Sequence, residues 1–149
     1  MTTLYSDSFT NIEQETIEEA KKLVKTGIWK KDVDVKIKVE NVKEFLKSLS
    51  DIYGIEAPRL LFDKSEDFYR MTGGFIYSPQ DKVISLYHKF SLVNILFAFR
   101  YHMQNCGLVD EMYLDDSKLD AVGWSMSIFK KATPKSWKRA VDNGMVMYK

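Results

Sequence analysis

Apolar residues recur along most of this chain with the spacing of a helix. The pattern predicts helices over about 11–25, 42–53, 92–105, 117–129 and 134–143. Glycines at 27, 54, 107 and 144 follow four of these segments, at a place where glycine commonly ends a helix. Residues 33–39 differ, because valine or isoleucine alternates there with charged residues. That alternation predicts a strand with one face in water.

A short hairpin is the other strong strand signal. The apolar segments 75–77 and 83–86 flank a polar turn that contains a proline. Residues 60–62 suggest one more short buried strand, and 66–71 a single helical turn. With no repeat, low-complexity tract or linker in 1–149, we expect one mostly helical α+β domain in which helices pack on a small antiparallel sheet.

Composition and charge favour a soluble, folded domain. The chain is 45% hydrophobic and 13% aromatic over 149 residues, which is enough to fill a core. A formal net charge of +1 gives no general attraction to nucleic acid or membrane. No apolar run approaches the ~20 residues of a membrane span. The single cysteine, Cys106, excludes an intramolecular disulfide, and we expect a cytoplasmic protein.

A sequence of motifs in the C-terminal half resembles a known family. Gly73 and Gly74 open the hairpin, and the following helix contains the segment 97–104, Phe-Ala-Phe-Arg-Tyr-His-Met-Gln. The next helix begins with 118–121, Lys-Leu-Asp-Ala. This order is similar to zincin-like metallopeptidase domains of some phage and archaeal proteins, whose helix pair reads H-E-F-R-H-H-L-Q and E-x-D-A. The resemblance covers about 73–144 and says nothing of the N-terminal part.

The resemblance implies a zinc peptidase in which each working position is replaced. In such domains two histidines one helical turn apart bind zinc, a glutamate is the general base, and a carboxylate on the next helix is the third ligand. The ligand positions here hold Phe97, Tyr101 and Lys118, and the base position holds Ala98. Phenylalanine cannot ligate zinc, alanine cannot accept a proton, and lysine places a cation where a cation would bind. Tyrosine ligates only as phenolate, with an ordinary pKa of about 10.

We therefore expect a pseudoenzyme with no catalytic residue, no metal and no cofactor. One alternative chemistry stays open, because His102 and Cys106 are also one helical turn apart. Together with His88 and Asp110 they could form a relocated metal site for a hydrolase. The competing interpretation makes His102 a structural histidine and Cys106 a small buried side chain.

Three polar residues of the same two helices are expected to be structural. Arg100 and Gln104 are one helical turn apart, which places them on one face of their helix. Asp120, on the next helix, is expected to pair with a base such as Arg100 or Lys118.

The last helix and the end of the helix before it are strongly basic. The residues concerned are Lys130, Lys131, Lys135, Trp137, Lys138 and Arg139. A basic helix with an aromatic residue can contact an acidic protein surface or phosphates, and it can equally be a solvated face.

The favoured interpretation is an inactive domain that binds or inhibits another macromolecule through this basic surface. A protein partner is the first expectation. The resemblance makes a viral protein directed at a host machine, such as a polymerase or a defence complex, one candidate. Three alternatives stay open: a nucleic-acid-binding module, a hydrolase with the relocated metal site, and a structural protein of a virion. The sequence leaves the oligomeric state open.

Overall fold

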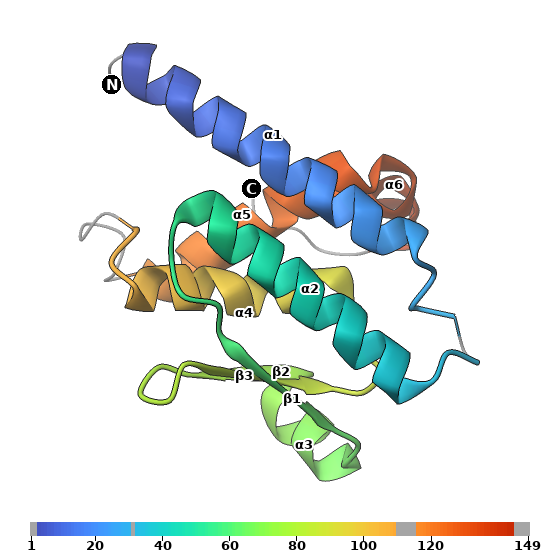
Figure 1. Cartoon of the computed structure of the whole chain (residues 1–149). Helices are drawn as coiled ribbons and strands as arrows, with labels where there is room; N and C mark the ends of the chain where they lie inside the picture. The colour runs from blue at the N-terminus through green and yellow to red at the C-terminus, as the bar shows by residue number, and fades with distance from the viewer. Residues whose placement is uncertain (1–2, 31, 110–115, 145–149) are drawn as a thin grey trace.

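Helices cover one face of a small three-stranded sheet (Figure 1). The computed structural model describes residues 3–30, 32–109 and 116–144. Its elements in chain order are α1 (Thr3–Lys25), α2 (Val35–Tyr53), β1 (Arg59–Asp63), α3 (Glu66–Thr72), β2 (Phe75–Ser78), β3 (Val83–Tyr87), α4 (Leu92–Asn105), α5 (Ser117–Ala132) and α6 (Pro134–Asp142). The expected mostly helical α+β domain is confirmed.

The sheet is mixed, with the strand order β1-β3-β2. The predicted hairpin is confirmed, since β2 and β3 are antiparallel and pair Phe75 with Leu86 and Tyr77 with Ile84. The expectation of an antiparallel sheet holds for β2 and β3 only, because β1 lies parallel to β3. Parallel neighbours need a crossover connection, and α3 with β2 supplies it.

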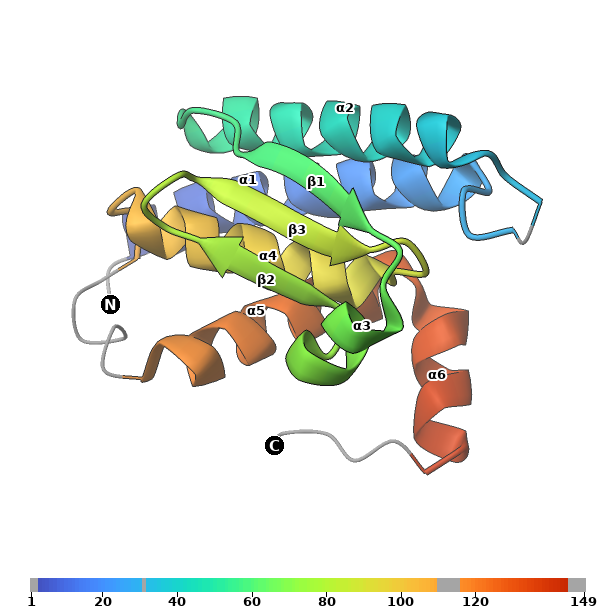
Figure 2. The same cartoon turned by 90° about the horizontal axis from the view of Figure 1, so that it is seen from below.

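Helix α4 is the centre of the core, packed against both the sheet and α5 (Figures 1 and 2). The side chains of Ile95, Leu96 and Phe99 are fully buried. Ser91 begins the helix with a capping box, in which its side chain and that of Asn94 each accept a hydrogen bond from the other's backbone N–H. The predicted bounds of this helix are confirmed, and its apolar surface follows from burial on most sides.

The predicted strand over 33–39 is wrong, because these residues form the first turns of α2. Asp34 caps the helix, and its Oδ1 accepts the backbone N–H of Lys36 at 2.9 Å. Apolar residues at 35, 39, 42, 46 and 49 keep a spacing of three and four, which forms one helical face. Ile37, which a strand would have buried, is 49% exposed. The helical spacing continues through the segment, whereas the alternation stops after a few residues.

A buried ion pair joins α4 to α5. Arg100 donates from Nε to Asp120 Oδ2 at 2.8 Å and from Nη2 to Asp120 Oδ1 at 2.9 Å. Gln104 donates to the same Oδ2 at 2.9 Å and to the carbonyl of Ser117 at 2.8 Å. The guanidinium also lies 5.4 Å from the Trp124 ring centroid. The expected structural roles of Arg100, Gln104 and Asp120 are confirmed, with Arg100 as the partner of Asp120.

The environment of Asp120 favours its charged form. Burial alone would raise the pKa of this carboxyl, but the hydrogen bonds from Arg100 and Gln104 outweigh burial and hold the pKa below its usual value. Both side chains of the Arg100–Asp120 pair are only 10% exposed. Removing one partner therefore leaves a charge that water reaches poorly.

Asp120→Asn should lower the free energy of unfolding by about 3 kcal/mol, because Arg100 keeps its buried charge without a carboxylate. Urea unfolding monitored by circular dichroism measures the change. The matched control is Asp67→Asn, which removes the carboxylate of the exposed Asp67–Arg70 pair and should have a far smaller effect. Equal effects of the two substitutions would contradict the structural role of Asp120.

Candidate functional site

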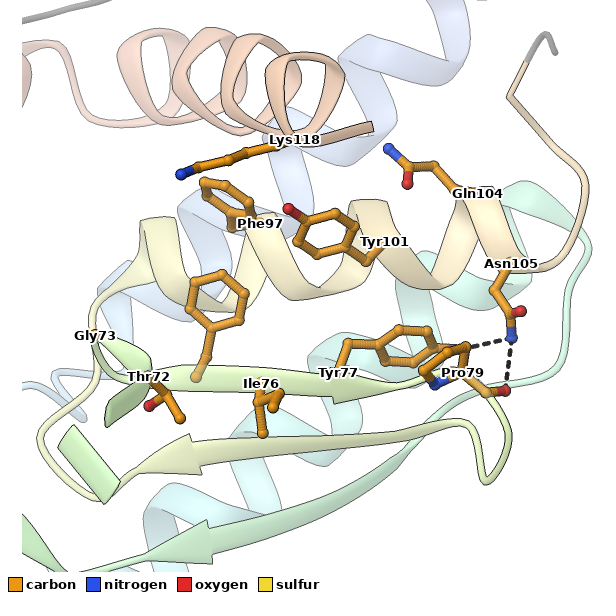
Figure 3. A pocket seen from close by; sticks show the side chains of 11 residues that line it. Thr72, Gly73, Ile76, Tyr77, Pro79, Phe97, Tyr101, Gln104, Asn105 and Lys118 are labelled. Atoms are coloured by element: carbon orange, nitrogen blue, oxygen red, sulfur yellow. Dashed lines mark hydrogen bonds between the residues drawn. The ribbon is translucent and has the colours of Figure 1, made fainter. Parts of the chain in front are cut away.

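A groove opens where α4, the start of α5 and β2 meet (Figure 3). We call it the α4–α5 groove, and its volume is about 750 Å³. Its lining residues are Thr72, Gly73, Phe75, Ile76, Tyr77, Pro79, Phe97, Tyr101, Gln104, Asn105 and Lys118. Residues from both faces of β2 take part, so the groove runs along the edge of this strand that pairs with no other strand in the described sheet.

All three positions aligned with zinc ligands line this groove. Phe97 and Tyr101 enter from α4, and Lys118 enters from α5 (Figure 3). The ring centroid of Phe97 lies 5.4 Å from that of Tyr101 and 4.9 Å from that of Phe75, which makes this wall aromatic. Ala98 lies elsewhere, since it is fully buried in the core and does not line the groove.

The residues of the groove do not fit the zinc ion that the resemblance implies. None of its lining side chains is a histidine, a cysteine or a carboxylate. Its one charged lining residue, Lys118, would repel a metal ion. Within the described parts of the chain, no three histidine, cysteine or acidic side chains lie close enough together to hold a metal.

A chain of hydrogen bonds through His102 reaches the groove at Tyr77, Asn105 and Pro79. His102 Nε2 lies 2.7 Å from the backbone carbonyl of Glu56, and its Nδ1 lies 2.6 Å from the hydroxyl of Tyr77. A carbonyl only accepts, so Nε2 carries the proton and Nδ1 accepts from Tyr77. Asn105 Nδ2 in turn donates at 3.0 Å to Tyr77 Oη and at 3.0 Å to the carbonyl of Pro79. The chain joins α4 to β2, to the β2–β3 turn and to the segment before β1.

Of the two interpretations of His102, metal ligand or structural histidine, the contacts favour the structural one, because both ring nitrogens are engaged in hydrogen bonds. Its side chain is fully buried, and burial lowers its pKa below the usual value of about 6.5. The sequence reasoning missed Tyr77, Asn105 and Glu56. Tyr77 shares the inner face of its strand with Phe75, which was a usable signal, whereas a backbone carbonyl leaves no trace in the sequence.

The residues of the relocated metal site are not all together. Cys106 Sγ lies 3.7 Å from His102 Nε2, but that nitrogen donates to Glu56, and burial raises the pKa of the thiol. His88 lies at the far end of the sheet, where its backbone N–H donates to the carbonyl of Asp63, the last residue of β1. Asp110 falls outside the described residues.

The predicted basic surface divides into two sets. On α6, Lys135, Lys138 and Arg139 are exposed, share one face by their spacing of three and four, and make no ion pair with any residue the structure describes. Helix α6 has no buried residue and projects at one side of the molecule, packed mainly on α5 (Figure 2).

The other three residues of that surface are engaged locally. Lys131 pairs with Glu13 of α1 and so fastens α5 to α1. Lys130 lies 5.5 Å from the centroid of the Trp137 ring, which itself packs edge-on against Phe129 at 6.2 Å. Trp137 is therefore partly covered by the protein's own side chains, and the free cations are those of α6.

No protein-family model, curated protein or solved structure matches this chain. Among the described helices, none combines the length and the apolar character that crossing a membrane requires.

Rebuilding the ligands should create a zinc site if the three groove positions correspond to those of zincins. We expect the wild-type chain to hold no stoichiometric zinc after dialysis and the F97H/Y101H/K118E variant to hold about one zinc per chain, by elemental analysis. The control variant F97H/Y101H/L119E carries the glutamate on a neighbouring exposed residue outside the groove and should bind far less. Zinc in the wild type, or none in the rebuilt variant, would contradict the correspondence.

His102 should make the protein less stable in mild acid. Its pKa is lowered in the folded state, so the unfolded chain binds more protons below pH 6.5. Its contribution to stability is complete above about pH 6.5 and is lost as the pH falls towards the folded-state pKa. Urea unfolding between pH 7 and 5 measures the loss, and nitrogen NMR of the imidazoles gives the pKa, with His88→Gln assigning the signals. A His102 pKa at or above 6.5 would refute this account.

Proposed function

We propose that this chain is a catalytically inactive zincin-like domain that acts by binding another macromolecule, most simply a protein. Support for the first half is the position of Phe97, Tyr101 and Lys118. These residues were aligned with zinc ligands from sequence motifs alone, and they come from two different helices. They nevertheless line the same groove, as the remains of a shared metal site would. None of the three side chains can take over the role of the ligand it replaces, and Ala98 cannot act as a base.

The basic face of α6 carries the second half of the proposal. Lys135, Lys138 and Arg139 are exposed on a helix that contributes no buried residue to the core. Among the described residues these three cations make no ion pair. A partner that supplies carboxylates would form ion pairs with these three cations, and their fixed spacing on the helix would make the binding specific.

An acidic protein surface suits this face better than nucleic acid does. Helix α6 has nine residues, which corresponds to about 13 Å of length and to contact with few phosphates. The net charge of +1 gives little long-range attraction to a polyanion. Trp137 packs on Phe129, so its ring is only partly available to stack on a base. Nucleic acid nevertheless remains the second candidate, because phosphates can bind the same three cations.

The proposal places the protein in the cytoplasm. If the resemblance reflects ancestry, the setting is that of a virus or mobile element acting on a host machine such as a polymerase or a defence complex. That identification rests on the resemblance alone. A virion component remains the structural alternative, which self-association at physiological concentration would reveal.

The variant K135E/K138E/R139E should lose partner binding while keeping its fold, because it reverses the three free cations of α6 and touches no buried residue. The measurement compares the proteins captured by wild-type and variant chains from an extract of the cells in which the chain is made. The matched control K36E/K43E/K47E makes the same change in charge on exposed residues of α2 and should capture the same proteins as the wild type. Identical capture by all three chains would refute the α6 assignment.

A labelled DNA duplex separates the two kinds of partner. Contact with three phosphates predicts about 40-fold weaker binding when salt rises from 50 to 200 mM. Binding that shows this dependence and disappears in the α6 variant would move the conclusion to nucleic acid.

A further inference from the structure

The α4–α5 groove contains two polar groups that have no partner among the residues the structure describes. Lys118 is exposed and forms no ion pair or hydrogen bond within the described part of the chain, and the Tyr101 hydroxyl likewise forms none there. Figure 3 shows the Lys118 side chain extending from α5 alongside Phe97 and Tyr101. An ammonium group and a phenol hydroxyl are thus available at the same wall.

The rest of that wall is apolar and aromatic. The rings of Phe75, Phe97 and Tyr101 follow one another at centroid distances of 4.9 and 5.4 Å. On the strand side, Ile76 is 52% exposed, although it is a large hydrophobic residue. A flat ring placed in the groove would cover this apolar surface and could pack at an angle against the three rings, as aromatic pairs prefer.

We propose that the α4–α5 groove is a binding site for a small aromatic carboxylic acid. The ring of the ligand packs against Phe75, Phe97 and Tyr101, and its carboxylate accepts hydrogen bonds from Lys118 Nζ and Tyr101 Oη. Charge complementarity selects an anion, because Lys118 is the one charged residue in the lining. Burial raises the pKa of Tyr101, so its phenol keeps the proton that it donates at neutral pH.

The dimensions of the groove favour a small acid over an extended peptide. A volume of about 750 Å³ suits a compact organic ligand. Strand addition to β2 is the obvious alternative, but β2 has four residues, Phe75–Ser78, and is followed by Pro79, which has no N–H to donate. So short an edge offers few main-chain hydrogen bonds. The site is independent of α6 and of the partner proposed for it.

A pair of probes that differ in charge but hardly in shape tests the site. The full chain is titrated with 2-naphthoate and with 2-naphthylmethylammonium, and binding is followed by calorimetry and by NMR. The wild type should bind naphthoate at least about tenfold more tightly than the ammonium compound, by the attraction of Lys118. Lys118→Glu should reverse this preference, and Tyr101→Phe should weaken naphthoate about threefold.

Three controls keep the test decisive. Lys43→Glu on α2 makes the same charge change outside the groove and should leave naphthoate binding unchanged. Lys118→Gln should remove the preference between the probes without reversing it, and it serves if Lys118→Glu disturbs the fold. No binding of naphthoate, or binding that Lys118→Glu and Lys118→Gln leave unaltered, would overturn the proposal. A blocked hexapeptide of alternating phenylalanine and glutamate tests the alternative of strand addition. If it bound far more tightly than naphthoate and lost this binding on backbone methylation, strand addition would be the function of the groove and the proposal would be overturned.

Discussion

The structure depends on the burial of α4 on almost all its sides. Its buried polar side chains, Arg100 and His102, cannot reach water, so each of them must find a partner on a neighbouring element. Arg100 finds Asp120 and thereby fixes the position of α5, and His102 finds Tyr77 and the Glu56 carbonyl and thereby fixes the sheet. The packing of the domain around α4 is therefore set by a few directed contacts as well as by apolar area.

The groove lies on a side of α4 that the described parts of the protein leave open. Under the proposed ancestry, the same space in a zincin would hold a metal that links two helices and is surrounded by polar ligands. Here the Arg100–Asp120 pair, supported by Gln104, makes the direct link between α4 and α5. Neither Arg100 nor Asp120 lines the groove; of this network only Gln104 does. The other groove residues can therefore change without loss of the link between the two helices. Under the proposed ancestry, that independence explains how the ligand positions could all be replaced while the helix pair was kept.

The sequence predicted the elements whose signals agree with one another. The hairpin and α4 have caps, turns and periodicity that point to the same structure, and both were found with nearly the expected bounds. The segment 33–39 carried two conflicting signals, and the helical one prevailed because Asp34 caps it and the apolar spacing continues into α2. The parallel position of β1 depends on the crossover through α3, which no local pattern encodes.

The candidate site was only partly predictable, for a related reason. The choice of Arg100 for Asp120 over Lys118 depends on which side of α5 faces α4, and the division of the basic residues depends on α1, since Glu13 takes up Lys131. Such contacts are made between elements far apart in the chain. A single sequence shows the residues capable of making them, but the choice among possible partners follows from packing.

The attachment of α6 separates the demands of folding from those of recognition. No side chain of this helix is buried, so substitutions on its basic face create neither a cavity nor an unpaired buried charge. Natural variation can therefore accumulate on this helix faster than in α4, where the buried Arg100 and His102 are each fixed by their partners. A lineage under pressure to follow a changing partner could alter its specificity there in single steps, each leaving the folded population intact.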